Sequence, residues 1–131
     1  HHLETLFKET GEYPVMNQIE LHPELQLPEL REFCNENDVI VEAWRPLMNG
    51  NVDQLTELVE IGKKHRKSPY QVALRFLTQS NVVVIPKASS ISRVKENIDI
   101  YDFELNNVEM DTIKFLNKDL RIGADPDNFD F

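Results

Sequence analysis

The sequence predicts an α/β fold with about three parallel strands and flanking helices. One observation is that short apolar runs alternate with longer segments whose apolar residues recur at helical spacing. A second is that the runs at 39–44 and 82–85 are apolar at most positions, which is typical of strands covered on both faces of a parallel sheet. Strands that alternate with helices are joined by right-handed crossovers, so we expect these strands to run parallel.

The first part of the chain is expected to form helix, strand, helix and strand. Residues 1–10 have apolar residues at helical spacing, and Gly11 suits the left-handed conformation that ends many helices. A strand is expected at 15–21, before a His-Pro pair that stops it. Pro28 can open the next helix, because proline suits the first helical position, and the apolar run at 39–44 follows it.

The second part is expected to contain an additional helix before the third strand. The expected elements are a helix at 55–62, a helix opened by Ser68 and Pro69, a strand at 82–85, a helix at 92–98 and a helix from Asn106. Ser68 and Asn106 are good N-cap residues, and Glu109 follows Asn106 at the spacing of a capping box. The tail at 121–131 contains turn residues and is expected to be irregular.

Length and composition narrow the functional classes. The chain has 131 residues and a formal net charge of −9, which fits a single domain and argues against nucleic acid or an anionic membrane as partner. No apolar run approaches the roughly 18 residues of a membrane span. Cys34 is the one cysteine, so an intrachain disulfide and a zinc site are not expected. The start lacks the succession of a secretory leader, and a cytoplasmic location is expected.

Several segments resemble the aldo-keto reductase family over almost the whole chain. They are NQIELHP at 17–23, IVEAWRPL at 40–47, IPKASS at 85–90 with the Arg93, Glu96 and Asn97 that follow, and the closing residues 125–131, which resemble bacterial members. The third segment is the most specific, because it spaces lysine, arginine, glutamate and asparagine after a buried strand. The resemblance implies the second half of a (β/α)8 TIM barrel, so residues 1–131 would be a single partial domain.

The resemblance also implies an activity for the parent enzyme. Aldo-keto reductases transfer hydride from NADPH to a small aldehyde or ketone, with a tyrosine as proton donor. The family's catalytic Asp, Tyr, Lys and His lie on strands two to four, which have no counterpart in this sequence. The resemblance therefore implies a cofactor-binding half without catalytic residues, and no carbonyl reduction is expected from this chain alone.

By resemblance, two groups of residues would bind NADP. Gln18 would hydrogen-bond the nicotinamide carboxamide, and Trp44 would stack on the nicotinamide ring. Pro46 and Leu47 would line the pyrophosphate. The residues expected around the adenosine 2′-phosphate and the adenine are Lys87, Arg93, Ser89 or Ser90, Glu96 and Asn97.

Two positions depart from the common family pattern. Arg45 stands where a serine often lies beside the pyrophosphate, and it adds a cation there. Ala88 stands where a serine often contacts the phosphate, which could weaken the preference for NADP over NAD. NADP remains the expected cofactor despite these two departures.

Other interpretations remain open from the residues alone. Lys87 and Arg93 without their neighbours would indicate a solvated surface, and Trp44 a core aromatic. A different class of function is a non-catalytic half-barrel that binds nucleotide or self-associates, because a sheet of three parallel strands leaves two unpaired edges. A flavodoxin-like sheet is supported only by the alternation of strands and helices, and the segment at 85–90 argues against it.

Overall fold

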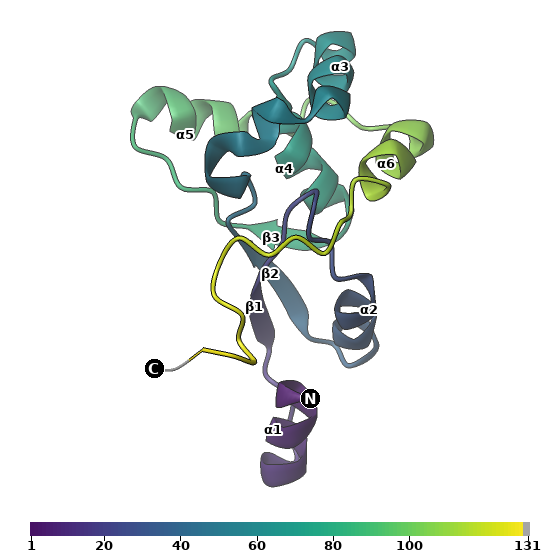
Figure 1. Cartoon of the computed structure of the whole chain (residues 1–131), viewed down its shortest axis with the longest axis vertical. Coiled ribbons are helices and arrows are strands. Elements are labelled where there is room, and N and C mark those ends of the chain that lie inside the picture. The colour runs from purple at the N-terminus through teal and green to yellow at the C-terminus, as the bar shows by residue number, and fades with distance from the viewer. Residues whose placement is uncertain (130–131) are drawn as a thin grey trace.

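The structure is a computed structural model and describes residues 1–129. Its elements in chain order are α1 (His2–Thr10), β1 (Met16–Glu20), α2 (Pro28–Glu36), β2 (Ile40–Trp44), the 3-10 helix η1 (Met48–Gln54), α3 (Thr56–His65), α4 (Pro69–Gln79), β3 (Val82–Val84), α5 (Ile91–Ile98) and α6 (Asn107–Lys114). The strands form one parallel sheet in the order β1-β2-β3 (Figure 1). The predicted α/β fold with parallel strands is confirmed.

The helix ends follow local signals in the sequence. The Ser68 hydroxyl accepts the Gln71 backbone N–H at 3.3 Å, and the Gln71 side chain accepts the Ser68 N–H at 3.0 Å, which makes a capping box at the start of α4. Asn106 and Glu109 form the equivalent pair at α6. Gly11 ends α1 with φ +80°, a conformation that favours glycine. Residues 121–129 contain no helix or strand, and 130–131 lie outside the described residues.

The two faces of the sheet differ in how they are covered. On one face, Val41, Ala43 and Val82 are buried in a core that includes Phe76 of α4 and Cys34 of α2. The opposite face is open: its apolar side chains Met16, Ile40, Val83 and Ile85 are 39%, 44%, 42% and 44% exposed. The expectation that residues 39–44 and 82–85 are covered on both faces is therefore wrong for this chain, because the helices bury only one side.

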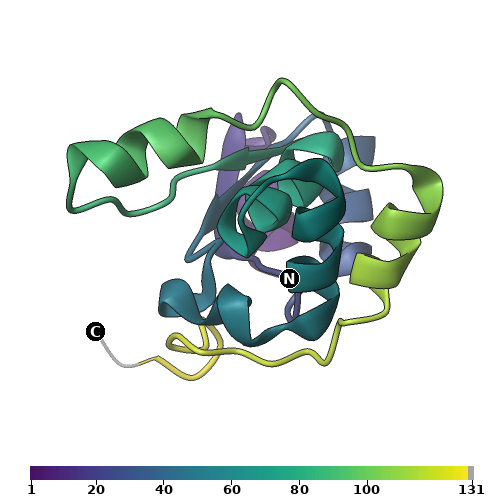
Figure 2. The same ribbon diagram turned by 90° about the horizontal axis from the view of Figure 1, so that it is seen from above.

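The carboxyl ends of the parallel strands lie at one edge of the sheet, with α5 beyond β3 (Figures 1 and 2). Gln71 of α4 holds α5 in place, since its Nε2 donates to the carbonyl oxygens of Glu96 at 3.1 Å and Asp99 at 3.0 Å. Lys67 adds ion pairs to Asp99 at 2.9 Å and to Asp102 at 2.7 Å. These contacts fix α5 relative to the sheet edge. Within residues 1–129, no helix has both the length and the apolar character that a bilayer crossing requires.

Candidate cofactor site

A cavity of about 640 Å³ lies beyond the carboxyl ends of β2 and β3. This volume is within the usual range of small-molecule pockets. Most of the residues predicted to bind the cofactor line it, namely Arg45, Pro46, Leu47, Lys87, Ser89, Arg93, Glu96 and Asn97. The structure thus brings together residues from the loop after β2, the loop after β3 and α5.

The cavity is positively charged in a chain that is strongly acidic. Among residues 1–129, Arg45, Lys87 and Arg93 line it with a single carboxylate, that of Glu96, although the chain has a net charge of −9. Within residues 1–129, none of the three cations has a carboxylate within 4.0 Å. Unpaired cations converging on one cavity are suited to an anion such as phosphate.

The loop after β2 approaches the cavity in an unusual backbone conformation. Arg45, Met48 and Asn49 have φ values of 53°, 52° and 57°, and Gly50 has φ +95°. Asparagine and glycine adopt the left-handed region more easily than other residues, and both line the cavity here. The loop therefore folds tightly enough to bring its backbone to the cavity wall.

Tyr70 also lines the cavity, although no sequence pattern pointed to it. Its hydroxyl donates to Asp53 Oδ2 at 3.0 Å and so joins α4 to η1. Partial burial, followed by the hydrogen bond to Asp53, raises the pKa of Tyr70, so the phenol stays neutral. The contact is between elements that are distant in sequence, and no local motif indicates it.

Ser90 has a different position from its neighbour Ser89. Its hydroxyl caps α5 by accepting the Arg93 backbone N–H at 3.3 Å, and it lies 3.0 Å from Ser92 Oγ. Ser89 lines the cavity and Ser90 does not. Of the two serines offered by the sequence, Ser89 is the better placed to contact a ligand.

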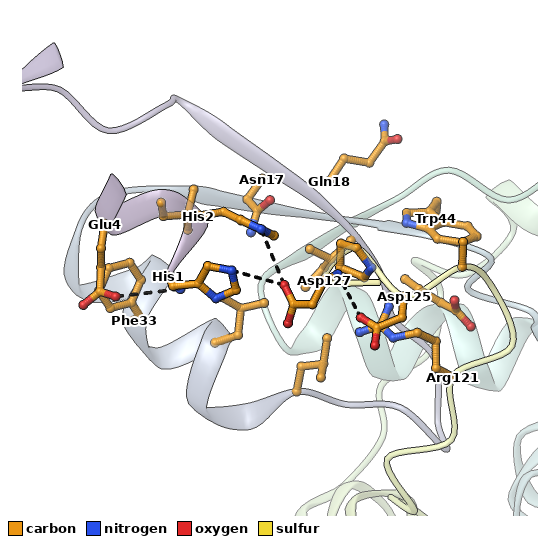
Figure 3. A pocket seen from close by; sticks show the side chains of 17 residues that line it. His1, His2, Glu4, Asn17, Gln18, Phe33, Trp44, Arg121, Asp125 and Asp127 are labelled. Carbon is orange, nitrogen blue, oxygen red and sulfur yellow. Dashed lines mark hydrogen bonds and ion pairs between the residues drawn. The ribbon is translucent and has the colours of Figure 1, made fainter. Parts of the chain in front are cut away.

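Gln18 and Trp44 line a second cavity, of about 440 Å³, on the side of β1 (Figure 3). Arg45 connects the two cavities, because its guanidinium carbon lies 4.9 Å from the centroid of the Trp44 ring. At the outer end of the second cavity, Nε2 of His1 and of His2 lie 3.3 Å and 3.5 Å from Asp127 Oδ1. All predicted cofactor residues except Ser90 thus line one of two adjoining cavities.

The C-terminal tail forms one wall of the second cavity, and Glu20 anchors it. The Glu20 side chain is buried, and its two carboxylate oxygens accept the backbone N–H groups of Ile122 and Gly123, each at 2.7 Å. A Cβ at Gly123 would lie 2.2 Å from Trp44 Cη2 and 2.6 Å from Glu20 Oε2. A larger residue at position 123 would force the Trp44 ring or the Glu20 carboxylate to move, because the tail backbone packs directly against the edge of the Trp44 ring.

His22 completes this anchor as a neutral side chain. Its Nδ1 accepts the Glu24 backbone N–H at 3.3 Å, so the ring proton is on Nε2, which donates to Glu20 Oε1 at 3.3 Å. Burial lowers the pKa of His22, although the neighbouring Glu20 carboxylate opposes this change. Because the tail lies about a hundred residues from Glu20 along the chain, the sequence could not identify it as the partner of Glu20.

Comparison with known proteins gives a consistent assignment. The model of the Aldo/keto reductase family matches residues 2–118. The chain is 47% identical to glyoxal reductase of Bacillus subtilis, over all of this chain and 48% of the relative. It is 46% identical to 9,11-endoperoxide prostaglandin H2 reductase of Trypanosoma cruzi, over 98% of this chain and 47% of the relative.

Solved structures match the fold equally well. A mutant of Gox0644 in complex with NADPH superimposes with a TM-score of 0.95 at 41% identity, covering 99% of this chain and 48% of that one. MGS-M4, an aldo-keto reductase from a deep-sea metagenome library, gives a TM-score of 0.96 at 34% identity, over 100% of this chain and 49% of that one. The chain spans about half the length of the curated relatives it matches. The three-stranded sheet and its helices thus correspond to about half of an aldo-keto reductase barrel, and the chain belongs to the aldo/keto reductase family.

Proposed function

We propose that this chain is the C-terminal, NADP(H)-binding half of an NADPH-dependent aldo-keto reductase. The observation that carries the proposal is the positive cavity at the carboxyl ends of β2 and β3, where Arg45, Lys87 and Arg93 lack carboxylate partners within residues 1–129. A nucleotide with a 2′-phosphate would satisfy these cations. A fold neighbour that is itself complexed with NADPH supports the same ligand.

Each side of the cavity would hold a different part of the cofactor. Lys87 and Arg93 would bind the 2′-phosphate, with the Ser89 hydroxyl as a further donor, and Arg93 could also stack on the adenine. Glu96 and Asn97 would hydrogen-bond the adenine or its ribose. Arg45, Pro46 and Leu47 would lie along the pyrophosphate. The negative charge of the pyrophosphate would accommodate the cation at position 45.

The nicotinamide end would lie on the open face of the sheet, beside Gln18 and Trp44. Trp44 would stack on the ring, held at its edge by the tail at Gly123, and Gln18 would hydrogen-bond the carboxamide. NADPH supplies hydride when bound, and the substrate would be a small aldehyde or ketone, as the name of the relative glyoxal reductase suggests. The residues of this chain would bind and orient the cofactor without supplying the proton donor, so the purified chain alone should not reduce carbonyls. A reducing cytoplasm remains the expected location.

The proposal is tested by calorimetric titration of the chain with 2′,5′-ADP, which carries the 2′-phosphate and no nicotinamide. Arg93→Ala is expected to weaken binding about 10-fold, because a hydrogen bond to a charged group contributes roughly 1.5 kcal/mol or more. The lower end of that range applies since Arg93 is exposed.

Lys95→Ala is the matched control. Lys95 is also an exposed cation of α5, but it does not line the cavity, so the same charge change should leave affinity within about twofold. Equal losses in both variants would mean that general electrostatics, and not this cavity, binds the ligand. No binding of 2′,5′-ADP to the folded chain would contradict the proposed cofactor site.

The open face of the sheet favours a second function, that of a half-barrel which self-associates. Met16, Ile40, Val83 and Ile85 present apolar surface there, and among residues 1–129 β1 and β3 each pair only with β2. A second copy could cover this face and pair with an edge strand. Light scattering over a range of concentrations distinguishes a self-associating half-barrel from a monomer. A monomer that also shows a cooperative thermal transition would count against self-association.

A further inference from the structure

Gln18 and Glu42 form a hydrogen bond in the middle of the open sheet face. The parallel register places them directly opposite each other on β1 and β2, and Gln18 Nε2 lies 2.6 Å from Glu42 Oε1. Because side chains alternate along a strand, Trp44 lies on the same face as Glu42, two residues further toward the carboxyl end. Gln18 projects away from His1, His2 and Asp127 (Figure 3). The pair thus belongs to the side of the sheet where Trp44 lies.

The chemistry of this pair fixes the orientation of the Gln18 amide. A carboxylate only accepts hydrogen bonds, so the end of the amide that faces Glu42 must be the NH2 group. The amide oxygen of Gln18 is then directed away from Glu42. If a glutamine were opposite, either end of the amide could face it, and both orientations would be available.

We propose that Glu42 is a positioning residue that holds the NH2 end of the Gln18 amide and so directs the Gln18 oxygen, an acceptor, toward the nicotinamide carboxamide. This inference rests on the proposed function, in which Gln18 contacts that carboxamide. The site then selects a ring substituent with an N–H donor, and a substituent that can only accept would face the Gln18 oxygen unfavourably. Glu42 acts through Gln18 and does not itself need to touch the cofactor.

The test compares NADP+ with its 3-acetylpyridine analogue, in which a methyl ketone replaces the carboxamide and no N–H remains. The unmodified chain is expected to bind NADP+ about 5-fold more tightly than the analogue, since one net hydrogen bond is lost. In Glu42→Gln, the Gln18 amide can turn and donate to the ketone, so the ratio should fall to about 1–2. The readout is affinity, measured by calorimetry, and needs no turnover.

A second variant separates orientation from general packing. Gln18→Leu removes the amide and should also abolish the preference, and adding Glu42→Gln to it should then change the ratio no further. A Glu42→Gln variant that keeps the full preference would overturn the inference, as would equal binding of both nucleotides by the unmodified chain. So would a further change of the ratio in the double variant.

Binding of 2′,5′-ADP distinguishes this inference from the proposed function. That ligand lacks nicotinamide, so Glu42→Gln should leave its affinity unchanged. If 2′,5′-ADP fails to bind the unmodified chain, the proposed function is wrong. If it binds normally and the NADP+ preference is insensitive to Glu42→Gln, only the role of Glu42 is wrong.

Discussion

Replacing Glu20 by alanine is expected to lower the free energy of unfolding by about 3 kcal/mol and to detach the C-terminal tail. The substitution leaves the N–H groups of Ile122 and Gly123 and the Nε2–H of His22 without their acceptor. Each buried donor left unsatisfied costs roughly 1–3 kcal/mol, but the tail can turn its two N–H groups to water. The net loss in the free energy of unfolding should therefore lie well below the sum of the costs of the three donors.

Urea unfolding gives the stability change, and amide exchange at Ile122 and Gly123 reports the tail directly. Glu20→Gln should show a smaller loss, because its amide keeps one oxygen acceptor. Glu104→Ala removes an exposed carboxylate and should change stability by no more than about 0.5 kcal/mol. Unchanged exchange in Glu20→Ala would mean that the tail is held by other contacts.

Gly62→Ala is expected to destabilise the protein by about 2 kcal/mol, although alanine favours a helix by about 1 kcal/mol over glycine. A Cβ at Gly62 would lie 2.4 Å from the Lys67 carbonyl oxygen and 3.4 Å from its carbon. Both atoms are backbone and cannot rotate away, and Lys67 N–H is bonded to the Gly62 carbonyl at 2.9 Å. Steric overlap should thus outweigh helix propensity.

The shift of the Lys67 backbone that Gly62→Ala would cause should also affect the cofactor cavity. The backbone that would clash belongs to Lys67, and the capping pair of Ser68 with Gln71 comes next in the sequence. Lys67 and Gln71 also hold the end of α5 through their contacts with Asp99. We therefore expect weaker binding of 2′,5′-ADP together with a lower urea midpoint. Glu57→Ala, at an exposed position of the same helix, is the control and should change neither by much. A stabilised Gly62→Ala variant would show that α3 can shift without cost.

The elements that the sequence predicted well are those with local causes. Ser68 and Asn106 cap helices through partners three residues away, and the apolar, β-branched run at 82–85 contains β3 although only one side of it is buried. The convergence of Lys87 and Arg93 on one cavity was also anticipated, but through family resemblance and not through spacing. Local chemistry was sufficient for the starts of α4 and α6 and for the order of the strands, whereas the 3-10 helix η1 was not predicted and α3 ends at His65, beyond the expected range of 55–62.

What the sequence could not predict depends on contacts between distant residues. The Glu20 contacts to the tail span 102 and 103 positions, and the bond from Tyr70 to Asp53 joins separate elements. Apolar residues on both sides of residues 39–44 suggested burial on both faces, but which helices are present to cover them is a tertiary property. The pairing of Gln18 with Glu42 follows from strand register, which composition alone does not give.

The anchoring of the tail has a consequence for the order in which the molecule is completed during synthesis. Each strand pairs with the one made just before it, so the sheet can assemble in the order in which a ribosome releases it. Ile122 and Gly123 are added more than a hundred residues after Glu20. The Glu20 carboxylate must therefore stay hydrated in the nascent chain, with the edge of Trp44 uncovered. Closure of the tail over Trp44 can then occur only after Ile122 and Gly123 have left the ribosome.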